Sequence, residues 1–121
     1  MSDYFFYAAM LRFVANKTEA ADPGAHAMMA ELRAVADAAS AGPRVTVAAD
    51  RLELAARAFA GFAAFLQKQI LPEAVALGNA GAEAQLRWAV DVAMAGVNTL
   101  LGRAALVEER CAVELILPPP P

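Results

Sequence analysis

Two side chains have the chemistry of a general base or a nucleophile, and each residue type occurs once. His26 lies one helical turn after Asp22, so a carboxylate could orient its imidazole as a general base requires. No Ser, Cys or Lys is spaced to supply a nucleophile beside it. Cys111 falls on an apolar helical pattern, which favours a small buried residue over a reactive thiol. We therefore expect no catalytic residue, and the sequence does not indicate an enzyme.

Metal and nucleotide chemistry lack their usual patterns. Glu108 and Glu109 are adjacent acids with no histidine near them, whereas di-iron helical bundles use Glu-x-x-His pairs. Gly96 and Gly102 interrupt a helical pattern instead of following a strand, so they do not form a phosphate-binding loop. We expect no metal and no cofactor.

The aromatic residues allow two interpretations. Phe59, Phe62, Phe65 and Trp88 could line a cavity for an apolar ligand. Aromatic residues at helical spacing more often form a core, and we favour that interpretation. The indole N–H of Trp88 needs a hydrogen-bond partner or an exposed edge, so we expect Trp88 at an interface or at the rim of a pocket.

The composition favours a helical protein that covers apolar surface with a partner. Hydrophobic residues make up 60 % of the 121 residues and charged residues 19 %, with a net charge of −3. Much of the apolar excess is alanine, the strongest helix former. Both signs of charge are scattered, without the basic run typical of nucleic-acid binding, although a folded patch could still form from Arg12, Lys17, Arg44 and Arg51. Nucleic acid is therefore an unlikely partner.

The stretch from Leu86 to Leu115 is expected to be the central packing element. One apolar row has alternating spacings of four and three, and a second row lies about 100° around the same helix. The first row is Leu86, Val90, Ala93, Val97, Leu100, Ala104, Val107 and Cys111; the second is Trp88, Val92, Ala95, Leu106 and Val113. A helix that is apolar on two sides needs partners on two sides. We expect the first two helices to cover part of the first row.

Caps and breakers place the other helices. Ser2 can cap a first helix, and the Asp22-Pro23 pair marks the start of a second. Pro72 should break or kink the third helix at Leu71, with a short helical restart to Leu77. The expected helices span residues 3–17, 23–39, 47–71 and 82 to about 115. The fold class is therefore an all-α bundle of four main helices with a long C-terminal helix.

The last part of the chain has two interpretations. In the preferred one, the fourth helix continues until Pro118 forces it to stop. In the alternative, Val113–Leu117 is a strand paired with Arg44–Val47. Residues 1–117 are expected to form one domain, and residues 118–121 a short polyproline tail that is either a docking segment or simply the end of the chain.

These observations favour a non-enzymatic interaction module. It would be an accessory subunit, adaptor or occluding inhibitor that self-associates or binds another protein through apolar helix faces. The expected interface residues are Tyr4, Phe5, Tyr7, Trp88, Val92, Ala95, Leu106 and Val113. The alternatives are a carrier or sensor of an apolar small molecule and a helical subunit of a nucleoprotein complex. The sequence has no signal-peptide pattern and no apolar run long enough to span a bilayer, so we expect a cytoplasmic protein without a membrane partner.

Overall fold

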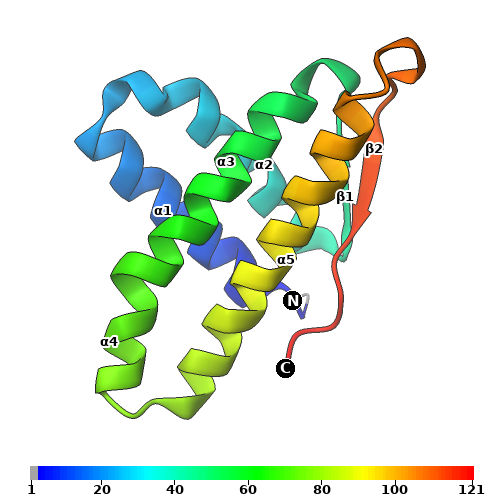
Figure 1. Ribbon diagram of the computed structural model, residues 1–121. Helices are drawn as coiled ribbons and strands as arrows, with labels where there is room; N and C mark the ends of the chain where they lie inside the picture. The colour runs from blue at the N-terminus through cyan, green and yellow to red at the C-terminus, as the bar shows by residue number, and fades with distance from the viewer. Residues whose placement is uncertain (1–2) are drawn as a thin grey trace.

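Helices make up most of the computed structural model, which describes residues 3–121 (Figure 1). The elements, in order, are α1 (Phe5–Ala21), α2 (His26–Ala41), β1 (Arg44–Val47), α3 (Leu52–Phe65), α4 (Leu71–Ala76), α5 (Ala80–Ala104) and β2 (Val113–Ile116). The expected all-α class is confirmed, with only a small two-stranded sheet added. The expected cap at Ser2 lies outside the described residues.

Two side-chain caps start helical segments close to where the sequence predicts them. The Asp22 carboxylate accepts a hydrogen bond from the Gly24 amide at 3.0 Å and opens a 3₁₀ turn that leads into α2. Asn79 accepts from the Ala82 amide at 3.1 Å and caps α5. Between α4 and α5 the chain turns at Gly78, whose φ of 66° is a left-handed conformation that glycine adopts without steric cost.

Pro72 does not end the helical rod that consists of α3, a π-helical turn and α4. Residues Leu66–Ile70 form a π-helical turn between α3 and α4. A proline has no N–H to donate to the preceding turn, and its ring crowds the carbonyl four residues earlier. Inserting a wider turn just before Pro72 relieves that clash, and the helix continues to Ala76.

The expectation that the last helix reaches Leu115 is wrong, because α5 ends at Ala104 and β2 follows. Glu108 and Glu109 would place negative charge at the negative end of a longer helix. Arg110 instead folds back and donates to the Ala104 carbonyl from Nη2 at 3.0 Å. The same guanidinium binds Glu53 of α3. The strand alternative is confirmed.

The two strands pair antiparallel, with Arg44 opposite Ile116 and Val47 opposite Val113. Side chains alternate between a buried inner face and an exposed outer face, as a half-buried strand requires. Residue 43 stands opposite Leu117, and the Leu117 amide donates to the Pro43 carbonyl at 2.8 Å. Pro43 has no N–H, so it cannot donate the second hydrogen bond of this residue pair. The Leu117 carbonyl accepts from the Tyr4 hydroxyl at 3.2 Å, which fastens the end of the sheet to the start of α1.

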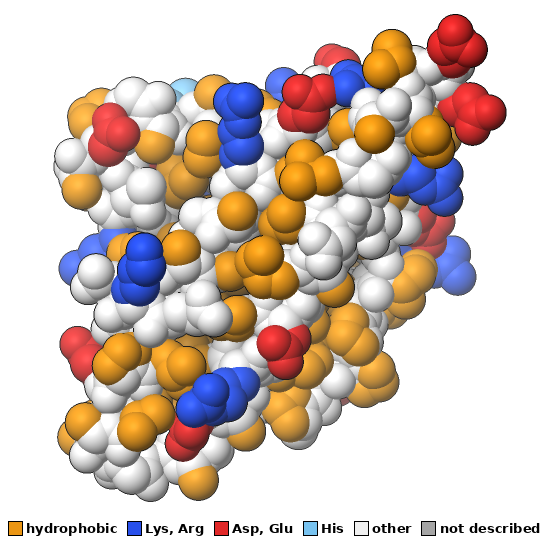
Figure 2. Space-filling model, in the orientation of Figure 1, with side chains coloured by type: hydrophobic (Ala, Val, Ile, Leu, Met, Phe, Trp, Pro, Cys, Tyr) orange, Lys and Arg blue, Asp and Glu red, His pale blue; other side chains and the backbone are white. Residues whose placement is uncertain are grey.

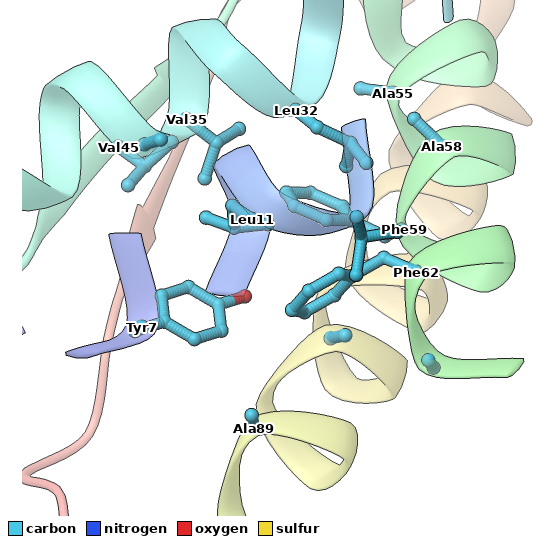
Figure 3. Close-up of a cluster of buried hydrophobic side chains, with 14 of the residues drawn as sticks. Tyr7, Leu11, Leu32, Val35, Val45, Ala55, Ala58, Phe59, Phe62 and Ala89 are labelled. Atoms are coloured by element: carbon cyan, nitrogen blue, oxygen red, sulfur yellow. The ribbon is translucent and has the colours of Figure 1, made fainter. Parts of the chain in front are cut away.

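One hydrophobic core joins the main helices and both strands. The α3–α4 rod runs antiparallel to α5, and α1 pairs with α2 behind them (Figure 1). In Figure 3, Leu11 of α1 lies beside Phe59 of α3, deep in this core. The first row of α5 is buried from Leu86 to Ala104, but mainly against α3, not α1 and α2 as expected.

Candidate functional site

An apolar groove of about 390 Å³ lies between α5, β2 and the C-terminal tail. It is half open to solvent and is mostly lined by carbon. Its lining residues are Tyr7, Val35, Val45, Phe59, Trp88, Asp91, Val92, Ala95, Gly96, Thr99, Glu114, Leu115, Ile116, Leu117, Pro118 and Pro119. Among the described residues this is the best-formed concave site that the fold offers. It is therefore the candidate site.

The first wall is one face of α5. Trp88, Val92, Ala95 and Thr99 lie at spacings of four, three and four, so their side chains share one stripe of the helix. Gly96 has no side chain, so nothing projects from the α5 wall where α5 crosses α3. A Cβ there would lie 3.6 Å from the Phe59 ring, which is ordinary contact. The helix is held against α3 by its buried first row, which fixes where this wall stands.

The second wall is the outer edge of β2. In this register Val113, Leu115 and Leu117 exchange hydrogen bonds with β1, because the bond from Leu117 to Pro43 fixes which residues face the partner strand. The N–H and C=O groups of Glu114 and Ile116 consequently point to the other edge. The described chain has no third strand on that edge. The groove is thus bounded by backbone donors and acceptors as well as by carbon.

Two tyrosine rings hold Trp88 at the edge of the groove. Tyr4 stacks on the indole with ring centroids 6.4 Å apart, and Tyr7 meets it edge-on at 5.3 Å. Tyr7 also packs edge-on against Phe62. Burial raises the pKa of the Tyr7 hydroxyl above its ordinary value. The indole Nε1 is buried and has no hydrogen-bond partner in the described chain.

The charged groups that line the groove are acidic. Asp91 stands on the α5 wall and forms no ion pair within residues 3–121, because Arg87 is bound to Glu83 at 2.8 Å. Arg87 also stands four residues before Asp91 on α5, but its guanidinium pairs with Glu83 instead. Glu114 lies 3.6 Å from Arg44 on the outer face of the sheet. The mouth of the groove therefore carries net negative charge.

The expected interface residues lie in four different settings. Trp88, Val92 and Ala95 come together as the α5 wall of the groove. Tyr7 and Val113 are almost fully buried within the chain, Tyr7 against Phe62 and Trp88 at the floor of the groove and Val113 as an inward strand residue. Tyr4 is half-buried, fastened to Leu117 and Trp88. Phe5 and Leu106 are exposed and lie outside the groove, with Leu106 beyond the end of α5.

The two residues with reactive side chains lie elsewhere. The His26 ring binds Glu19 through Nδ1 at 2.8 Å, and not Asp22, whose carboxylate is used as a cap. Hydrogen bonds from Arg33 and then from His26 lower the pKa of Glu19. Cys111 is exposed, because the helix expected to bury it ends at Ala104. Of the cavity-lining aromatics considered, Phe59 and Trp88 reach the groove, while Phe62 is in the core and Phe65 meets Phe13.

The β2 half of the groove is not predicted by the preferred helical interpretation. Its sequence signal is the alternation of polar and apolar residues in 44–47, whereas 113–117 has a polar residue only at Glu114, and the apolar rows of 86–115 are a stronger pattern. No sequence pattern indicates that Asp91 and Thr99 stand beside a strand that begins at Val113.

Comparisons with protein-family models, curated proteins and solved structures found no match to this chain. Within the part that the structure describes, no helix combines the length and apolar character needed to cross a membrane.

Proposed function

We propose that this chain is a non-enzymatic interaction module, an adaptor or accessory subunit, whose binding site is the groove between α5 and β2. The observation that carries the proposal is the composition of this groove: an apolar floor, a helical wall and a strand edge in one site. Its polar groups are carboxylates, hydroxyls, an indole N–H and backbone amides. These groups can orient a ligand, and its lining residues include no histidine, cysteine or lysine.

A second candidate is a carrier of an apolar small molecule. The volume of about 390 Å³ favours it, because cavities for small ligands start near about 300 Å³. The half-open shape and the unpaired strand edge favour the interaction module, since a purely apolar ligand leaves the edge groups without partners.

We further propose a cytoplasmic location. Cys111 is the single cysteine and its side chain is exposed, which suits a compartment that keeps thiols reduced.

A groove-filling variant tests the site. Ala95→Trp places an indole over the groove from an exposed position, so the core stays intact. Met94→Trp is the matched control, because Met94 is exposed on the same helix but outside the groove. Both variants and the parent chain are titrated with peptides from a random-peptide display selection and with the neutral dye Nile red.

We expect the selected peptides to bind the parent chain and Met94→Trp with similar affinity, and Ala95→Trp at least about tenfold more weakly. Equal binding to all three chains would place the site elsewhere. Nile red binding that Ala95→Trp abolishes, with no peptide enriched, would assign the groove to the small-molecule carrier.

A further inference from the structure

We propose, on the basis of the function above, that the occupant of the groove is an extended basic and apolar peptide segment of a partner protein. It adds as a third strand to the outer edge of β2. Alternate side chains enter the groove, and a lysine or arginine lies beside Asp91.

The hydrogen-bonding pattern of the edge specifies an extended backbone. Glu114 and Ile116 each direct one N–H and one C=O away from β1. In a strand, residues two apart are spaced by roughly 7 Å and point their backbone groups the same way. Only another extended chain presents acceptors and donors at that repeat. A helix has used its own backbone groups, and an aliphatic ligand has none.

The two walls determine how much peptide fits. Pro118 and Pro119 follow Leu117 just after β2 and carry no N–H, so within β2 the edge offers pairing positions at Glu114 and Ile116. A partner strand of about three residues satisfies both positions. Because side chains alternate along a strand, the residues on one face of this segment meet Val92, Ala95 and the groove floor, and the others face solvent.

The acidic lining of the groove favours a basic partner. Asp91 stands on the groove wall without an ion pair in residues 3–121, and the neighbouring Glu114 is only partly neutralised by Arg44. The chain as a whole has a net charge of −3. A second copy pairing edge to edge would add its own Asp91 and Glu114 to a site whose charged lining is already acidic, which is unfavourable for like charges. A basic segment gains attraction at the same place.

A pair of variants at one position isolates the strand contact. Ile116→Pro removes the N–H that points to the open edge but leaves the pairing with β1, which uses Leu115 and Leu117. Ile116→Ala shortens the side chain and keeps the N–H, so it is the matched control. The probe is a fluorescein-labelled, acetylated hexapeptide of alternating lysine and valine, measured by fluorescence anisotropy. Thermal unfolding of both variants confirms that they are folded.

We expect Ile116→Pro to bind about tenfold more weakly than Ile116→Ala, because both variants lack the isoleucine side chain and only the proline also lacks the N–H. The same peptide N-methylated at alternate residues should lose binding in one register and keep it in the other. Asp91→Asn should weaken binding and flatten its salt dependence, while Glu109→Gln, outside the groove, should not.

The outcomes separate this inference from the proposed function. Equal loss in Ile116→Pro and Ile116→Ala overturns strand addition, and the groove remains the site if Ala95→Trp still abolishes binding. If Ala95→Trp binds normally, the groove proposal fails instead. A parent dimer in light scattering that Ile116→Pro dissociates would assign the edge to a second copy and overturn the basic-peptide occupant.

Discussion

Individual buried polar groups are where this alanine-rich chain departs from a simple apolar core. Glu31 of α2 is 8 % exposed, and its Oε1 lies 2.6 Å from Nε of Arg51, just before α3. Tyr7 carries the largest fully buried side chain. Both residues tie α1 or α2 to α3. Burying a charged or phenolic group at such a site costs desolvation free energy, which is offset only while its partners stay in place.

The Glu31–Arg51 pair predicts an asymmetric response to substitution. Arg51→Met leaves a buried carboxylate without its cation, and we expect it to lower the free energy of unfolding by about 2 kcal/mol. Arg57→Met, at an exposed position of α3, is the control and should change stability by less than about 0.5 kcal/mol. Urea unfolding measures both. Adding Glu31→Met to Arg51→Met should recover most of the loss, and no recovery would show that the pair is not the cause.

Tyr7 predicts an alkaline limit to stability. Its pKa is raised by burial above the ordinary value of 10.0, because the core disfavours the phenolate. Above about pH 10 the unfolded chain releases this proton and the folded chain keeps it, so the free energy of unfolding falls by up to about 1.4 kcal/mol per pH unit. Denaturant unfolding between about pH 8 and 11 should show this fall, and Tyr7→Phe should flatten it. An unchanged slope in Tyr7→Phe would assign the fall to other groups.

At the scale of elements, the sequence predicted starts better than ends. Asp22-Pro23 and Pro72 act through their own backbone or side chain, so their effects are readable locally. The end of α5 depends on Arg110 reaching the Ala104 carbonyl and Glu53, and on β1 lying ready to accept β2. Those contacts join residues far apart in the chain. A heptad count that runs through Val107 and Cys111 cannot register them.

The same division holds for the candidate site. Trp88, Val92 and Ala95 were predictable as one apolar stripe because helical spacing alone groups them. Their proximity to Glu114 and Ile116 could not be predicted, because the sequence does not show which residues of a strand face its open edge until the pairing register is known.

Substituting two glycines, one within α3 and one in the turn after α4, is expected to change stability in opposite directions. Gly61 lies within α3, and a Cβ there meets nothing within 4 Å, so Gly61→Ala should stabilise the chain by about 1 kcal/mol. Gly78 has a φ of 66°, and Gly78→Ala should destabilise it by about 1 kcal/mol. Paired urea titrations measure the difference. Effects of the same sign would mean that the turn after α4 adjusts its conformation.

At the scale of the whole molecule, apolar surface remains after the core is complete. Figure 2 shows apolar side chains along the face formed by α3 and α5, with charged side chains set singly among them and not gathered in one basic patch. On α1, Phe5, Phe6 and Phe13 are each about half exposed. Outward rings on one helix are typical of a contact with another protein.

The α1 face predicts weak self-association that is independent of the groove. We expect the light-scattering mass to rise with concentration, and Phe6→Lys to suppress that rise because it places a charge among the exposed rings. Ala20→Lys, exposed near the other end of α1, is the control. Association that persists in Phe6→Lys but disappears in a groove variant would move the contact away from α1.

Two prolines also limit the open edge of the small sheet, and both lie at the same end of it. Pro43 precedes β1 and is opposite Leu117, which Pro118 follows, so the ladder cannot lengthen beyond this end. An exposed strand edge is usually a template for fibril growth, and long flat edges are the dangerous ones. Here β2 has 4 residues, of which Glu114 and Ile116 face the open edge, and the prolines close one end. So short an edge stays available to a partner while offering little template for amyloid.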